Sequence, residues 1–212
     1  MMTMSLDPLV TRRRVGALPG IALALVASVV LGAATFFAQG VLPDLISSFA
    51  NSASGWTLVT AALVWSLRQR TGVSAVLGAV SFVGLVAGYT IASELRGIHY
   101  GPLVFGVIGL VVGPFVGVAA AWLHRREQRP AMGAAVLAGL ATGECVYGLT
   151  VVAETTSPFY WILIGVLGTA LLAVVLVRHV SRPAIRVAAI IATAAVAVAF
   201  CAVYTAVGLL AF

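Results

Sequence analysis

Apolar segments, most of them about 20 residues long, follow one another along almost the whole chain. A helix needs about 20 predominantly apolar residues to cross the hydrocarbon core of a bilayer. Of the 212 residues, 62% are hydrophobic and only 8% are charged, and the mean hydropathy is +1.14. A soluble domain of this length does not have such a composition. The sequence therefore predicts an all-α, polytopic transmembrane helix bundle.

Seven spans are predicted, forming a single transmembrane domain over residues 16–212 after a short tail over residues 1–15. They are expected at residues 16–39, 56–68, 73–95, 101–123, 131–153, 158–177 and 184–211. All loops between them are short, so no second domain is expected.

The positive charges predict the orientation of these spans. All twelve are arginines, and they lie at the ends of apolar segments rather than along one face. With the N-terminus in the cytoplasm, only Arg96 lies outside and the other eleven lie inside, as the positive-inside rule requires. We therefore expect a multi-pass protein of the bacterial plasma membrane, with the N-terminus inside and the C-terminus outside. The net charge of +6 is accounted for by the membrane, and nucleic acid is not an expected partner.

The second span is unusual because its apolar part, Trp56 to Leu67, is too short to cross a bilayer. The residues before it, 43–55, are rich in serine and include Pro43, Asn51 and Gly55. One interpretation is a broken helix at membrane depth, whose freed backbone groups line a cavity or are buried in protein. The alternative is an amphipathic helix on the outer surface, followed by a short, tilted span.

Glu144 lies near the middle of the fifth span, where an acidic residue is costly and usually faces the interior of a bundle. No arginine lies at membrane depth to pair with it, so the side chain is expected to need hydrogen-bond donors. We predict that Glu144 meets the segment 51–56, and that Tyr89 contributes a hydroxyl group. Glu144 would then either bind a ligand or form a structural bridge between two helices.

The candidate ligand-binding residues lie at one level of the predicted bundle, towards the outside. They are Glu144, Asn51, Ser52, Ser54, Trp56, Tyr89 and His99. No cofactor or metal site is predicted, since the three histidines lie at span ends on both sides and no metalloprotease motif occurs. The nucleophile elbow of hydrolases is also missing, so an enzyme is not the favoured interpretation.

Short motifs spread over roughly residues 25–150 resemble those of an uncharacterised family of bacterial multi-pass proteins, a domain of unknown function of about this length. They are Gln39-Gly40-Val41-Leu42-Pro43, Ala50-Asn51-Ser52-Ala53 with Trp56, Gly88-Tyr89, Leu95-Arg96-Gly97, Gly113-Pro114 and Glu144. The resemblance implies no activity. A weaker resemblance, to the substrate-capturing subunits of vitamin-uptake transporters, implies an ATPase or membrane subunit as partner. The chain also resembles compact seven-span terpene cyclases, but those need aromatic cavity walls, and only 8% of this chain is aromatic.

The favoured function is the binding or transport of a small molecule through an outward-facing cavity, with membrane lipids around the protein. The alternatives are an intramembrane enzyme that uses Glu144 as general acid, and an accessory membrane subunit without a ligand. If the protein binds or transports a small molecule, Glu144→Gln is expected to abolish binding or transport while leaving the fold largely intact.

Overall fold

The computed structural model describes residues 16–126 and 128–210, and of residues 209 and 210 the backbone alone. Within this part the chain forms seven α-helices and one short 3₁₀-helix, and no strand. They are α1 (Ala17–Ala38), η1 (Ser47–Asn51), α2 (Ala53–Leu67), α3 (Thr71–Leu95), α4 (Leu103–Trp122), α5 (Arg129–Val151), α6 (Pro158–His179) and α7 (Pro183–Leu210). The predicted tail over residues 1–15, with Arg12, Arg13 and Arg14, lies outside the described residues.

Six of these helices are long and apolar enough to cross a membrane, and α2 is the exception, with 15 residues. This confirms a helical bundle of membrane character with a short second helix. The structure places the start of α2 three residues earlier than the apolar pattern does, at Ala53 rather than Trp56. Ala53, Ser54 and Gly55 are not strongly apolar, so the hydropathy pattern does not include them. They are helical because their backbone N–H groups donate hydrogen bonds to side chains described below.

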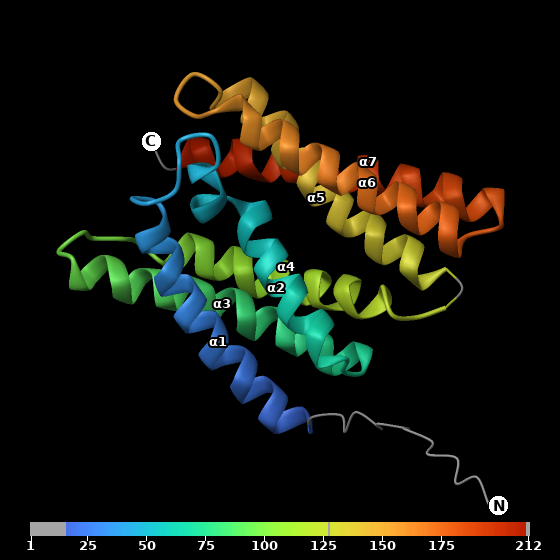
Figure 1. Ribbon diagram of the computed structural model, residues 1–212, viewed down its shortest axis with the longest axis horizontal. Coiled ribbons are helices and arrows are strands. Elements are labelled where there is room, and N and C mark those ends of the chain that lie inside the picture. Colours follow the sequence, from blue (N-terminus) through green and yellow to red (C-terminus); the bar gives the residue numbers. More distant parts are fainter. Residues whose placement is uncertain (1–15, 127, 211–212) are drawn as a thin grey trace, which may run out of the picture.

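The helices form two groups, defined by which helices pack most extensively against each other. One group consists of α1, α3 and α4, and the other of α5, α6 and α7 (Figure 1). Helices α4 and α5 pack against each other at the boundary, and α2 contacts both groups. The ends of the helices at η1, at the α3–α4 loop and at the α5–α6 loop gather on one side of the molecule, which we call the η1 end.

Small residues hold the helices of each group close together. A Cβ atom on Gly117 of α4 would lie 2.0 Å from the backbone oxygen of Ser74 in α3, and one on Gly78 would lie 2.0 Å from that of Gly113. On α5, Gly139 and Gly143 approach α7 in the same way. Close backbone approach at small residues is how apolar helices associate within a lipid environment.

The direction in which the bundle crosses the membrane stays a prediction, and cysteine labelling tests it. In a background without Cys145 and Cys201, His99→Cys at the η1 end should react with a membrane-impermeant maleimide in intact cells. Gln128→Cys, at the opposite end, should react only after the cells are opened. Both residues are exposed, so lack of reaction cannot be due to burial. Reaction of Gln128→Cys in intact cells would reverse the orientation.

Candidate functional site: a carboxylate in an aromatic cavity

Glu144 is buried in the bundle, and its carboxyl group meets the N-terminus of α2. Its Oε1 accepts a hydrogen bond from the backbone N–H of Ala53 at 2.7 Å, and its Oε2 accepts one from that of Ser54 at 2.5 Å. The predicted meeting of Glu144 with residues 51–56 is therefore confirmed. Two of the donors are backbone amides, whereas the hydroxyl group of Tyr89, which the sequence suggested, pairs with Gln39 instead.

This contact explains how a helix can begin inside the protein. The first four N–H groups of a helix have no partner within it and must find acceptors elsewhere. At the start of α2, Glu144 accepts from Ala53 and Ser54, and Ser52 Oγ accepts from Gly55 at 2.9 Å. The first bond within the helix then runs from the N–H of Trp56 to the carbonyl of Ser52 at 3.1 Å. The first three amides of α2 are thus satisfied from outside the helical ladder, and a carboxylate at this position also interacts favourably with the helix dipole.

Ser52 provides a second contact between the N-terminus of α2 and the group formed by α5, α6 and α7. It is buried, its backbone is extended, and its hydroxyl lies 2.5 Å from that of Tyr160 in α6. The chain thus forms the 3₁₀-helix η1, breaks at Ser52 and resumes as α2. A single extended residue thus separates η1 from α2, whereas the position of this break relative to a membrane stays a prediction.

A cavity of about 520 Å³ lies beside this carboxylate, between α4 and α7. Volumes of 300–1,000 Å³ are typical of small-molecule sites. The polar lining is confined to Glu144 and a few neighbours, among them Asn51, Ser52 and Thr57. The apolar lining includes seven aromatic side chains, which are Trp56, Phe82, Tyr100, Phe105, Phe115, Phe200 and Tyr204. The low aromatic content of the chain therefore gave a wrong expectation about this cavity, because the aromatic residues are concentrated around it.

The sides of the cavity are open towards the surroundings of the bundle where α4 faces α7. Phe115 of α4 is 64% exposed and Val203 of α7 is 48% exposed, although both line the cavity. Both are apolar and lie within helices of membrane-spanning length. Tyr100, in the α3–α4 loop, covers another part of the cavity, and burial raises the pKa of its hydroxyl, which therefore stays neutral.

The predicted site residues fall into two sets. Glu144, Asn51, Ser52 and Trp56 line the cavity, and Ser54 contributes its backbone N–H to Glu144. Tyr89 is not in the lining, because it packs between Phe36, Trp56 and Tyr100, and its hydroxyl accepts a hydrogen bond from Gln39 at 2.9 Å.

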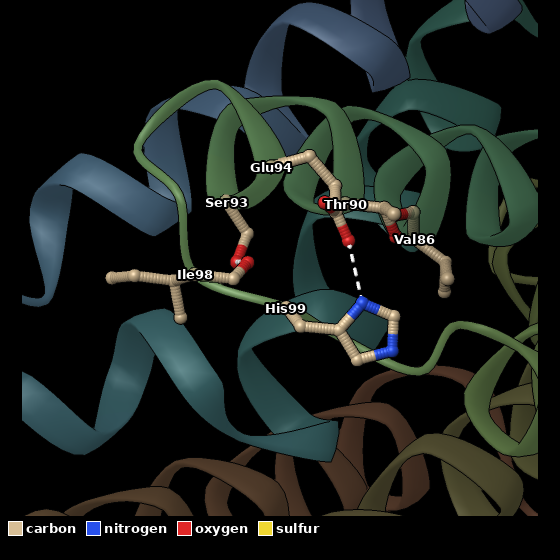
Figure 2. A network of polar contacts seen from close by, with 6 residues as sticks. All are labelled: Val86, Thr90, Ser93, Glu94, Ile98 and His99. Atoms are coloured by element: carbon tan, nitrogen blue, oxygen red, sulfur yellow. Dashed lines mark hydrogen bonds and ion pairs between the residues drawn. The ribbon is translucent and has the colours of Figure 1, made fainter.

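His99 also lies outside the cavity. Figure 2 shows its ring facing Glu94 across the turn that follows α3, with Nδ1 and Oε1 3.0 Å apart. The side chain of His99 is 88% exposed, so this pair contributes little to stability. The same turn is closed by Ser93, whose hydroxyl donates to the carbonyl of Ile98 at 2.6 Å. These two contacts stabilise the conformation of the turn between α3 and α4.

Sequence reasoning missed the lining residues of α7, such as Phe200 and Tyr204. Their rings stack with centroids 4.3 Å apart. A four-residue spacing places them on one face of a helix, but in an apolar helix this spacing does not show which face meets a cavity.

A family model matches residues 11–209, which is nearly the whole chain. The chain belongs to that family, which is a family of unknown function (DUF6518). Comparisons with curated proteins and with solved structures gave no match. The class of protein is thus a helical, multi-pass membrane protein, and its membership of an uncharacterised family is confirmed.

Proposed function

We propose that this protein binds an amphiphilic small molecule in the cavity between α4 and α7, in the plasma membrane of a bacterium. The observation that supports the proposal best is the position of Glu144, an acidic side chain in the wall of an otherwise largely apolar and aromatic cavity. Such a combination of apolar walls with a few polar groups is typical of ligand sites.

The head group of the ligand should donate hydrogen bonds or carry a positive charge. The carboxyl oxygens of Glu144 use one acceptor position each for the amides of α2, and a carboxylate offers about four. No ion pair joins Glu144 to a basic side chain within the described ranges. The aromatic rings of Trp56, Phe200 and Tyr204 line the same cavity, and ring faces attract ammonium groups. An amine or ammonium fits both features.

The rest of the ligand should be an apolar chain that reaches the cavity from the lipid. The exposed rim residues Phe115 and Val203 are apolar, so an acyl or alkyl chain can pass between α4 and α7 without meeting a polar barrier. The predicted outward-facing cavity becomes, in this proposal, a cavity near the η1 end that also opens sideways. Binding of this kind is compatible with transport, which needs a second conformation.

The general-acid alternative has less support from the geometry. A general acid must hold its proton towards the substrate. Both oxygens of Glu144 instead face backbone N–H groups, which are donors themselves. The aromatic side chains of the cavity favour an enzyme of the cyclase type. They are the single observation that supports this alternative. The accessory-subunit alternative and an ATPase partner, the second of which the weaker resemblance implies, stay predictions.

Filling the cavity should prevent binding without disturbing Glu144. Ala199 lines the cavity from α7 and is exposed, so Ala199→Trp should reduce the affinity for dodecylamine roughly tenfold or more, which corresponds to about 1.4 kcal/mol. The measurement is the ligand-dependent rise in melting temperature of the protein in nanodiscs of zwitterionic lipid.

The matched control is Ala202→Trp, since Ala202 is exposed on the same helix but is not in the cavity lining. It should retain the response, and dodecanoic acid, with the same chain and the opposite charge, should give none with either variant. Equal stabilisation by the amine and the acid in the unchanged protein would argue against the proposal.

A further inference from the structure

A second, smaller cavity lies at the opposite end of the molecule from η1. Its volume is about 160 Å³, and it lies where α2 and α4 end. The lining residues are Arg68, Gln69, Ala121, His124 and Arg125. Two guanidinium groups and an imidazole thus surround a space too small for a typical organic ligand. No acidic residue is in the described lining.

The side chains around this cavity are held in place by contacts with each other. The ring of His124 stacks on that of Trp65, with centroids 4.7 Å apart, and the guanidinium carbon of Arg68 lies 6.0 Å from the Trp65 ring. Arg125 is half-buried, and its Nη2 donates to the backbone oxygen of Gln69 at 3.5 Å. A cluster arranged in this way loses less side-chain entropy when a ligand binds.

Arg68 occupies a backbone conformation that favours glycine. It ends α2 with φ 50°, in the left-handed region. Helices commonly end with a residue in this conformation, and glycine is preferred because it has no Cβ atom. The left-handed conformation is less favourable for arginine than for glycine. The arginine side chain at this position lines the cavity.

The electrostatics of His124 show that the positive charge is not neutralised. Burial lowers its pKa, and the charges of Arg68 and Arg125 lower it further. In addition, its Nε2 atom is buried and has no hydrogen-bond partner in the part of the chain that the structure describes. Buried polar atoms are rarely left without a partner, and in the protonated imidazole this atom is a donor that needs an acceptor.

We propose that this cavity binds a phosphate group, held by Arg68 and Arg125 with His124 as an additional donor. Guanidinium groups recognise phosphate through paired N–H donors. The cavity lies just beyond the ends of α2 and α4, the second of which is long and apolar enough to cross a membrane, so the phosphate of an anionic lipid and free phosphate can both reach it. This proposal does not depend on the ligand of the larger cavity.

The test follows the imidazole signals of the full-length protein by NMR while the pH is varied. In nanodiscs of phosphatidylcholine, inorganic phosphate is added; in a second series, phosphatidylglycerol replaces part of the lipid. A bound anion stabilises the imidazolium, so the pKa of His124 should rise by about one unit. A response to free phosphate identifies a soluble ligand, and a response only to phosphatidylglycerol identifies a lipid.

Anionic lipid attracts protons to every group at its surface, so His179 serves as an internal reference for the general effect. Arg125→Gln and Arg68→Gln should each remove the additional shift of His124. Arg126→Gln changes the net charge equally at an exposed residue outside the lining, and it should leave the shift intact. The proposal fails if neither phosphate source shifts His124 more than His179, or if Arg126→Gln acts like Arg125→Gln.

Discussion

Glu144→Leu is expected to lower the free energy of unfolding by about 2–6 kcal/mol, because it leaves the part-buried N–H groups of Ala53 and Ser54 without acceptors. An unsatisfied buried donor costs about 1–3 kcal/mol, and two are created here. The tie between α5 and the N-terminus of α2 is lost at the same time. Unfolding by SDS titration or heating in a mild detergent measures the change.

Glu144→Gln should be intermediate, at about 1–3 kcal/mol. One amide of α2 keeps a carbonyl acceptor, but the other then faces the NH₂ group of glutamine, which is a donor. The structure therefore replaces the expectation, drawn from the sequence, that glutamine leaves the fold intact. Side-chain size is preserved by this substitution, whereas the pairing of two acceptors with two donors is not.

Glu154→Leu is the matched control for the stability effect. Glu154 is exposed after the end of α5, so its replacement should change stability little. If Glu144→Leu proves as stable as Glu154→Leu, the capping role is wrong. The ligand response separates the two roles of Glu144, because dodecylamine should no longer stabilise Glu144→Gln. A normal response of that variant would restrict Glu144 to its structural role.

Gly117→Ala is the second substitution with a large expected effect, a destabilisation of about 1–3 kcal/mol or more. The new methyl group would lie 2.0 Å from the backbone oxygen of Ser74, so α3 and α4 must move apart. A backbone oxygen cannot turn aside as the end of a flexible side chain can. The melting temperature in detergent should therefore fall by several degrees.

Gly106→Ala in the same helix is the control. No atom outside the helix lies within 4 Å of the position that its Cβ would take. Alanine is favoured over glycine within a helix by about 0.5–1 kcal/mol, so this variant should be as stable as the unchanged protein or slightly more stable. Comparable losses from Gly106→Ala and Gly117→Ala would mean that α3 and α4 are not packed as described.

Much of the architecture could be predicted from the sequence because hydropathy is a local property. The six long apolar segments form six long helices. The short apolar segment Trp56 to Leu67 lies within the short helix α2, which has 15 residues. Gly109, Gly113 and Gly117 are spaced four residues apart and so share one face of α4, where α3 approaches closely. The position of Glu144 in an apolar segment similarly indicated a buried acid that needed donors.

What the sequence alone determined about this protein is thus its class, its helices and the need of Glu144 for partners. The identity of the partners was decided by the tertiary structure. Backbone N–H groups carry no residue-specific signal, so the amides of Ala53 and Ser54 could not be named before α2 was seen to begin beside α5. The cavity walls were hidden for a related reason. In a chain whose helices are apolar on every side, no contrast between faces shows that Phe115 and Phe200 would meet around one cavity.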